Sequence, residues 1–218
     1  MKMKIKTFVF NPFQLNTFVV YDDSKSAIII DAGNSNESEN VELFDFISEE
    51  NLTIKGLYYT HAHVDHIVGN NAIITKYGIK AYASIHSDLF FDNAESHAKS
   101  LGFSLDNLIK PETTVKDGDT VKFGNSSLKV IYAPGHADGS ICFYSKDDMF
   151  IIVGDVLFRE SIGRTDLPTG NFDLLARSII DKLYVLPSGV KVLSGHGPST
   201  TIGHEKTNNP FVSISEQL

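Results

Sequence analysis

Histidine and aspartate side chains crowd into the segment "YYTHAHVDHIVG", which spans residues 58–69. Imidazole nitrogens and carboxylate oxygens are donors that zinc, iron and manganese accept in proteins. His61 and His63 stand two residues apart at the end of an expected strand, so their side chains point the same way and can meet one ion. Asp65 and His66 follow where the chain turns into a helix. They point elsewhere and can meet a second ion.

Three more residues of metal-ligating type stand at similar places later in the chain. His136 follows "VIYAPG", Asp155 follows "MFIIVG" and His196 follows "VKVLSG". Each comes directly after a glycine at the end of an apolar strand, and the strand ends of α/β folds are where sites assemble. Glycine permits the sharp turn or close backbone approach that such a position needs. Burying so many imidazoles and carboxylates without a cation would be costly, so the pattern predicts a metal centre.

Four further residues are candidates for supporting roles. Asp31 and Asp138 can orient ligand histidines, although turn or cap chemistry is the favoured interpretation for both. Arg159 and Arg164 lie in the loop "FRESIGRTD" after Asp155, where an arginine can bind a substrate carboxylate through two hydrogen bonds. An internal arginine–aspartate pair that shapes this loop is the equal alternative.

The elements expected around these residues alternate between strands and helices. The first half reads as the strands "IKTFVF", "LNTFVVYD", "SAIIIDAG", "IKGLYYT" and "IKAYAS", with helices over 37–50, 66–78 and 86–99. The second half reads as the strands "TVKFG", "SLKVIYAPG", "SICFYSK", "MFIIVGD" and "VKVLSGHG", with helices over 172–186 and from 202 to just before Pro210. Two similar halves of this kind predict an α/β (α+β) fold, with two packed sheets and helices outside them.

The bulk properties describe an ordinary globular protein. A length of 218 residues fits one domain, and a net charge of −8 without a long basic run argues against nucleic-acid or anionic-membrane partners. The single cysteine, Cys142, has no partner for an internal disulfide and is expected to be a buried thiol. No secretory signal or membrane-length apolar stretch is visible, so a cytoplasmic enzyme is expected. His86, His97 and His204 are expected to be surface or hydrogen-bonded residues rather than metal ligands.

The motifs together resemble a known family. "THAHVDH", "GH" at 135–136, "GD" at 154–155 and "GH" at 195–196 resemble the metallo-β-lactamase superfamily over essentially the whole chain. Within it, "NPFQLNTFVVYD", "GDVLFRESIGRTDLPTG" and "GHGPSTTIGHEKTNNPF" resemble the glyoxalase II group of hydroxyacylglutathione hydrolases, in particular its short, YcbL-type members. The resemblance implies a four-layer αββα sandwich with metal at one sheet edge. It implies a single domain over residues 1–218, without the C-terminal helical domain of full-length glyoxalase II.

The resemblance also implies which side chains hold two divalent ions. The first ion would be held by His61, His63 and His136. The second ion would be held by Asp65, His66 and His196. Asp155 would bridge the two ions. Asp65 and Asp155 are in addition the residues to which the resemblance assigns catalytic roles. In the family the two ions share a water or hydroxide. The donor set suits zinc, with iron or manganese as alternatives.

A metal-dependent hydrolase that acts on a small thioester, such as S-lactoylglutathione, is the expected function. A bound zinc ion lowers the pKa of water from ~15.7 to about 7 and so supplies a nucleophile at neutral pH. A thiolate leaving group also suits a soft metal. The main alternative is a persulfide dioxygenase with a single iron at the positions of His61, His136 and Asp155. A lactonase or β-lactamase is a further alternative.

The sequence departs from full-length glyoxalase II where those enzymes contact glutathione. They carry a lysine and a tyrosine in the loop after the bridging aspartate, and a tyrosine shortly after the last histidine. The comparable places here hold Arg164, Asp166 and Pro198. Glutathione recognition is therefore left open, whereas thioester hydrolysis depends on the metals.

Overall fold

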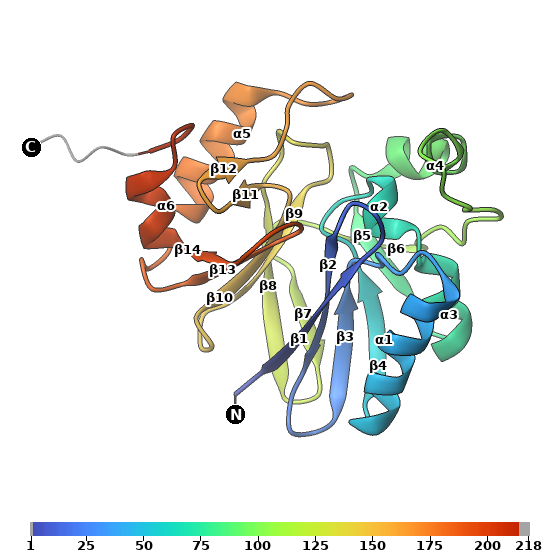
Figure 1. Cartoon of the computed structure of the whole chain (residues 1–218). Coiled ribbons are helices and arrows are strands. Elements are labelled where there is room, and N and C mark those ends of the chain that lie inside the picture. Colours follow the sequence, from blue (N-terminus) through green and yellow to red (C-terminus); the bar gives the residue numbers. More distant parts are fainter. Residues whose placement is uncertain (1, 214–218) are drawn as a thin grey trace, which may run out of the picture.

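Two six-stranded sheets form the centre of the molecule, which is described over residues 2–213 by a computed structural model (Figure 1). The first sheet has the order β1 (Lys4–Phe10), β2 (Leu15–Tyr21), β3 (Ser26–Ile30), β4 (Thr53–Tyr58), β5 (Ala81–Ser84) and β6 (Thr113–Val115). The second has the order β14 (Thr200–Thr201), β13 (Lys191–Ser194), β10 (Phe150–Gly154), β9 (Ile141–Ser145), β8 (Ser126–Tyr132) and β7 (Thr120–Phe123). A small hairpin pairs β11 (Leu157–Phe158) with β12 (Ser161–Ile162).

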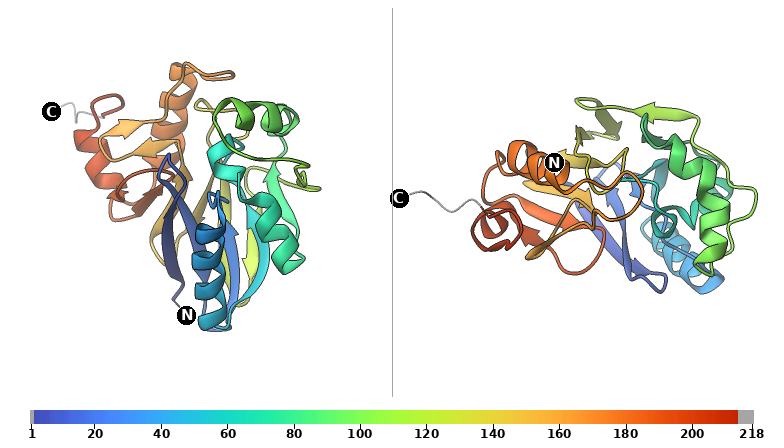
Figure 2. Two further views of the ribbon diagram at one scale, coloured as in Figure 1. Left: turned by 45° about the vertical axis from the view of Figure 1, so that its right-hand side comes forward. Right: turned by 90° about the horizontal axis from the view of Figure 1, so that it is seen from above.

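Helices cover the outer face of each sheet (Figure 2). The first sheet carries α1 (Glu37–Glu49), α2 (Val64–Ile67), α3 (Asn70–Tyr77) and α4 (Asp88–Ser100). The second carries α5 (Phe172–Ser178), which continues into a π-helical turn η1 (Ile179–Leu183), and α6 (Ile202–Asn208). Three apolar clusters separate the layers, one between the sheets and one beneath each set of helices. This is the predicted four-layer αββα sandwich.

The strand β3 shows how the sequence builds these layers. Ile28 and Ile30 lie in the cluster between the sheets, whereas Ala27 and Ile29 lie in the cluster under the helices. Successive side chains of a strand point to opposite faces of the sheet. A strand that is covered on both faces is therefore a continuous apolar run, which is how "SAIIID" reads.

The expected helix over 66–78 is wrong in one respect, because it is broken into α2 and α3. The N–H of Ala32 donates to the carbonyl of His66 at 2.7 Å, and the carbonyl of Ala32 accepts from the N–H of Gly69 at 2.8 Å. The side-chain amide of Asn11 donates to the carbonyl of Asp65. These contacts take backbone groups that a continuous helix would use, so the helix ends and restarts.

The other differences are smaller. The expected helix over 172–186 is α-helical only to Ser178 before it passes into η1. Four short strands were not predicted: β6, β11, β12 and β14. Two- and three-residue strands are too short to show an alternating pattern. The predicted single domain of residues 1–218 extends past the described residues at both ends and stays a prediction.

A buried aspartate joins the two sheets at the turns that follow β2 and β7. The carboxylate of Asp22 accepts hydrogen bonds from the N–H of Ser24 at 2.9 Å, the N–H of Asn125 at 2.8 Å and the hydroxyl of Ser126 at 2.8 Å. Burial alone would raise the pKa of Asp22, but the hydrogen bonds from Ser24, Ser126 and Asn125 lower it below its usual value. The ionised carboxylate is therefore the form that the folded protein stabilises.

We expect Asp22→Asn to lower the free energy of unfolding at pH 7 by about 1 kcal/mol or more, because the amide has one acceptor oxygen fewer. A carboxyl whose pKa is lowered on folding stabilises the protein above its unfolded-state pKa, and this stabilisation is lost as the pH falls through the folded-state pKa. The unfolding curves of wild type and variant should therefore converge in acid. Urea unfolding at pH 7 and at lower pH measures this, with Asp23→Asn on the exposed neighbouring side chain as control.

Candidate metal centre

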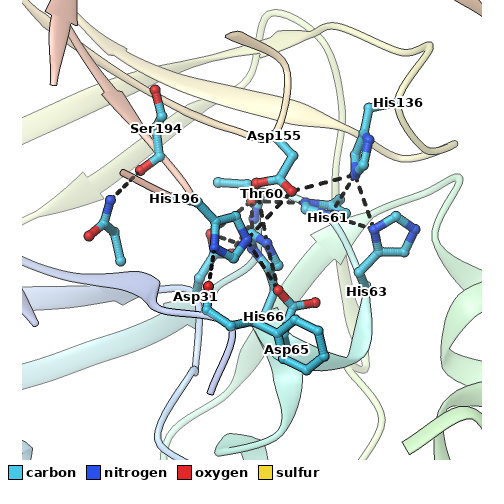
Figure 3. Close-up of polar contacts among 12 residues, drawn as sticks. Asp31, Thr60, His61, His63, Asp65, His66, His136, Asp155, Ser194 and His196 are labelled. Atoms are coloured by element: carbon cyan, nitrogen blue, oxygen red, sulfur yellow. Dashed lines mark hydrogen bonds and ion pairs between the residues drawn. The ribbon is translucent and has the colours of Figure 1, made fainter. Parts of the chain in front are cut away.

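All seven side chains predicted to bind metal meet at one place, at the ends of four strands (Figure 3). Four of them follow β4 of the first sheet, and one each follows β8, β10 and β13 of the second. They are His61, His63, Asp65, His66, His136, Asp155 and His196. The centre therefore lies across the edge where the two sheets meet.

Three histidines form the first group. The Nδ1 atom of His63 lies 3.0 Å from the Nε2 atom of His61 and 3.0 Å from that of His136, and the two Nε2 atoms lie 3.3 Å apart. All three residues are buried. Three nitrogens at about 2.0–2.1 Å from a tetrahedral ion would lie roughly 3.3 Å from one another. The spacing of these donors therefore fits one metal ion.

Asp65, His66 and His196 form the second group. The Oδ2 atom of Asp65 lies 3.2 Å from the Nε2 atom of His196 and 3.7 Å from that of His66. Asp155 lies between the groups: its carboxylate oxygens are 3.4 Å from His66 Nε2, 3.6 Å from His196 Nε2 and 3.7 Å from His136 Nε2. This is the arrangement that a bridging ligand would need.

Two buried atoms of the centre lack a hydrogen-bond partner within the described residues. They are the Nε2 atom of His66 and the Oδ1 atom of Asp155. An unpaired buried polar atom is costly, and native proteins rarely leave one unexplained. Because both atoms belong to the predicted ligand set, a cation between them accounts for the pair. The residues present therefore fit a metal centre.

The outer ring nitrogens of three histidines fix the direction in which each ring presents its lone pair. The Nδ1 atom of His66 donates to Asp31 Oδ2 at 3.0 Å, that of His136 to the carbonyl of Arg164 at 2.8 Å, and that of His196 to the carbonyl of Phe13 at 2.9 Å. Because an ionised carboxylate and a carbonyl only accept hydrogen bonds, Nδ1 must carry the proton. Each Nε2 atom then faces the centre, where a metal ion can take the place of a proton, as metal-binding histidines require.

Asp31 corrects the favoured interpretation from the sequence, which was turn or cap chemistry. Its side chain is fully buried, and it accepts hydrogen bonds from the N–H of Thr60 at 2.7 Å and from its hydroxyl at 2.8 Å, besides that from His66. Its φ of 61° is in the left-handed region, which is uncommon for a residue other than glycine. Asp31 thus holds both the start of the histidine-rich segment and one of its rings. No comparable side-chain contact of Asp138 to the centre occurs within residues 2–213.

The electrostatics of the first group favour neutral imidazoles. Burial lowers the pKa of His61 well below its usual value, and neighbouring histidines add to the effect. Burial also lowers the pKa of His63 to about 3. The pKa of His136 is lowered as well, because burial outweighs the attraction of the Asp155 carboxylate for a positive charge. A neutral ring keeps the lone pair that a metal ion accepts.

The second group carries the negative charge. Burial opposes ionisation of Asp155, yet His66 and the neighbouring histidines hold its pKa well below the usual range. Asp65 shows the same balance, and its pKa is lowered. At His66 burial disfavours the cation, but Asp31, Asp65 and Asp155 raise the pKa well above its usual value. The carboxylates therefore remain ionised at neutral pH and attract positive charge to this position.

The glycines that precede the ligands have steric reasons to be there. A Cβ atom on Gly195 would collide with Oδ1 of Asp155 and also with Cε1 of His66 in the histidine-rich segment. A Cβ atom on Gly154 would collide with the hydroxyl of Thr60, and Gly154 has a φ of 53° that disfavours other residues. These close approaches bring the strand ends of the second sheet up to the histidine-rich segment of the first.

The two candidate arginines have different surroundings. Arg164 forms a pair of hydrogen bonds with Asp166, at 2.8 and 2.7 Å, which is the internal pair that the sequence left open. Arg159 lies in the wall of a cleft of about 400 Å³ that also includes His196. A role in substrate binding stays a prediction for both residues.

Sequence reasoning missed Asn16, which attaches the last ligand to the first sheet. Its N–H donates to the carbonyl of Gly195 at 2.7 Å, and its side-chain amide donates to the carbonyls of Ser194 and Gly197 at 2.9 and 3.0 Å. An asparagine in a strand carries no signal of such a role. Its only mark was its place in the segment "NPFQLNTFVVYD", on which the resemblance rests.

The remaining histidines and the cysteine lie where they were expected. His86 and His97 are exposed. The Nε2 atom of His204 lies 2.9 Å from Oε1 of Glu160, and neither residue belongs to the seven-residue cluster. Cys142 is a free, buried thiol, and burial raises its pKa far above the usual value. No helix within residues 2–213 has the length and apolar character needed to cross a membrane.

The family model of the metallo-β-lactamase superfamily matches residues 10–196, a range that includes all seven side chains of the centre. The chain belongs to this superfamily. As a metallo-β-lactamase-superfamily protein, it combines the fold of a metal-dependent hydrolase with a histidine and aspartate cluster that suits divalent metal ions.

Relatives of this superfamily member extend over nearly its whole length. Hydroxyacylglutathione hydrolase GloC from Haemophilus influenzae is 33% identical over 213 residues, which cover 97% of this chain and 99% of the relative. The crystal structure of BLEG-1 B3 metallo-β-lactamase has a TM-score of 0.85 at 33% identity and covers 97% of this chain and 100% of its own. The structure of TTHA1623 in a di-iron-bound form has a TM-score of 0.84 at 29% identity, with 94% and 99% covered.

We expect Asp31→Asn to weaken metal binding by about 10- to 100-fold, because the amide no longer gives His66 an ionised acceptor. Competition with a chromophoric chelator measures the affinity, and circular dichroism checks that the variant is folded. Asp138→Asn is the matched control and should bind metal as the wild type does. Equal affinity of the Asp31 variant and the wild type would show that the contact with His66 does not tune the centre.

Proposed function

We propose that this protein hydrolyses small thioesters, with S-lactoylglutathione as the representative substrate, at a centre of two divalent metal ions. The observation that carries the proposal is the presence of two complete donor groups with Asp155 between them. Two relatives add support: GloC bears the name of a hydroxyacylglutathione hydrolase, and TTHA1623 has been described in a di-iron-bound form.

In this proposal each ion has its own donor group. The first would be held by His61, His63 and His136, the second by Asp65, His66 and His196, and Asp155 would contact both. Such ions, when bound, make water a stronger acid and polarise a carbonyl oxygen. We propose zinc as the resident metal, because imidazole and carboxylate donors suit it, with iron or manganese as alternatives.

The chain's own carboxylates supply the remaining chemistry. The side chains of Asp65 and Asp155 are 17% and 13% exposed, whereas that of His66 is fully buried. The carboxylates thus lie on the open side of the centre, where a substrate and its attacking water arrive. Their lowered pKa values keep them ionised at neutral pH. Each can then accept a hydrogen bond from the attacking water and orient it toward the carbonyl carbon, which are the catalytic roles that we propose for them.

The main alternative, a persulfide dioxygenase with one iron, would need only His61, His136 and Asp155. Persulfide dioxygenases share the same histidine–aspartate pattern, so the second donor group does not separate the two functions by its presence. What separates them is whether that group holds an ion. Metal content and reaction type together separate the two proposals.

We expect purified protein to contain two metal ions per chain, to hydrolyse S-lactoylglutathione, and to take up no oxygen with glutathione persulfide. Elemental analysis, thioester absorbance and an oxygen electrode measure the three quantities on one preparation. One iron per chain together with oxygen uptake would instead establish the dioxygenase.

Asp155→Ala should abolish hydrolysis and reduce the metal content to about one ion per chain or fewer, because the carboxylate shared by both groups is lost. Asp155→Asn tests whether the charge rather than the bulk of the side chain is needed. Metal analysis and thioester hydrolysis should be measured on variants whose circular dichroism matches that of the wild type. Hydrolysis at the wild-type rate with two bound ions would refute the bridging role.

A further inference from the structure

A cleft of about 400 Å³ lies directly beside the metal centre. One wall is the turn of the β11–β12 hairpin, Phe158–Ser161, and the other is the segment that follows β13, His196–Pro198. His196 belongs to both the cleft and the centre. A molecule bound in the cleft would therefore have one end against a predicted metal ligand.

Arg159 is the only cation that lines this cleft, His196 aside, and its guanidinium makes no hydrogen bond within residues 2–213. Its Nε atom lies 4.0 Å from Oε1 of Glu160, too far for a hydrogen bond. Glu160 instead contacts the Nε2 atom of His204 at 2.9 Å. The five N–H donors of Arg159 are thus available, and their planar arrangement matches a carboxylate. Arg164 differs, because Asp166 already occupies its guanidinium.

A buried glutamate fixes the hairpin that carries Arg159. Glu205 is fully buried in α6, and its carboxylate accepts hydrogen bonds from the N–H of Glu160 at 2.9 Å, the hydroxyl of Thr200 at 2.5 Å and the amide of Asn209 at 2.8 Å. The same amide of Asn209 donates to the carbonyl of Ser161 at 3.0 Å. Burying a carboxylate is costly unless such donors compensate. The turn that bears Arg159 is therefore held from beneath by a buried, compensated carboxylate.

These contacts also explain a segment that the metal centre leaves unexplained. The sequence "TTIGHEKTNNPF" follows the last ligand and supplies Thr200, Glu205 and Asn209. All three are buried, and all three act on the hairpin through one carboxylate. The polar side chains of this segment therefore hold the wall of the cleft in place and do not belong to the metal centre.

We propose that the cleft binds a carboxylate of the substrate through Arg159, and that Glu205 is a positioning residue that holds the turn bearing this arginine. The substrates would then be thioesters with a carboxylate on one side of the reacting bond, as in esters of peptide thiols. That the substrates are thioesters rests on the proposed function. The recognition of a carboxylate rests on the cleft alone.

Calorimetry with two thioether probes tests the cleft without turnover. S-methylglutathione carries free carboxylates, and its dimethyl ester does not. Wild-type protein should bind the acid about tenfold more tightly than the ester, which is the effect of one charge-assisted contact. Arg159→Ala should remove this difference by weakening only the acid, and Arg159→Lys should retain part of it. Arg177→Ala, an exposed arginine of α5, should bind both probes as the wild type does. Unchanged preference in Arg159→Ala would overturn the proposal.

Two variants test the positioning role. Glu205→Gln should weaken binding of the acid probe and raise KM for S-lactoylglutathione, with kcat and metal content nearly unchanged. Thr200→Val removes a different donor of the same carboxylate and leaves its contact with Glu160, so it should lower stability while the probe affinity stays as in the wild type. If Glu205→Gln lowers stability but binds the acid probe normally, the role is merely structural. The exposed Arg159 variants test the cleft whether or not Glu205→Gln folds.

The outcomes separate this proposal from the proposed function. Arg159-dependent binding of the acid probe without hydrolysis of S-lactoylglutathione would contradict the hydrolase and leave the cleft standing. Hydrolysis at a KM that Arg159→Ala does not change would contradict the cleft and leave the hydrolase standing.

Discussion

The metal centre depends on the hydrogen bonds that join the two sheets at their shared edge. The four ligands after β4 belong to the first sheet, and the three later ones belong to the second. Asn16 donates to three carbonyls around His196, and the N–H of Ile141 donates to the carbonyl of Thr60 at 2.8 Å. A shift of either sheet would separate donors of different sheets that now lie 3.0–3.4 Å apart. The packing of the sheets therefore sets the geometry of the chemistry.

Much of the fold and the ligand set could be predicted, because ligands at strand ends follow local rules. His61 and His63 share one direction by strand periodicity, and His136, Asp155 and His196 each end an apolar run. Contacts between segments that are distant in the chain follow no such local rule and could not be predicted from the sequence. The pairing of Ala32 with the helix at His66, which splits the predicted helix, depends on residues far apart in the chain. Asp31 was misjudged for the same reason, since an aspartate after a strand looks like a turn residue whatever it contacts.

The donors of the centre also limit the chemistry available. The lone thiol, Cys142, is sealed in the core, and burial raises its pKa, so it offers neither a nucleophile nor a soft metal ligand. Imidazole and carboxylate are what remains, and the structure sorts them by charge. The first group is held neutral, while the carboxylates of the second stay ionised. The two donor groups therefore differ in charge.

The division of the ligands between the sheets has a consequence for synthesis of the protein. A growing chain completes the first donor group when it reaches His136, but the second group waits for His196, which belongs to the last strand pair. Neither group can close until its partner sheet has docked. The ribosome therefore releases the two donor groups in a fixed order, and the second group can assemble only after His196 has emerged.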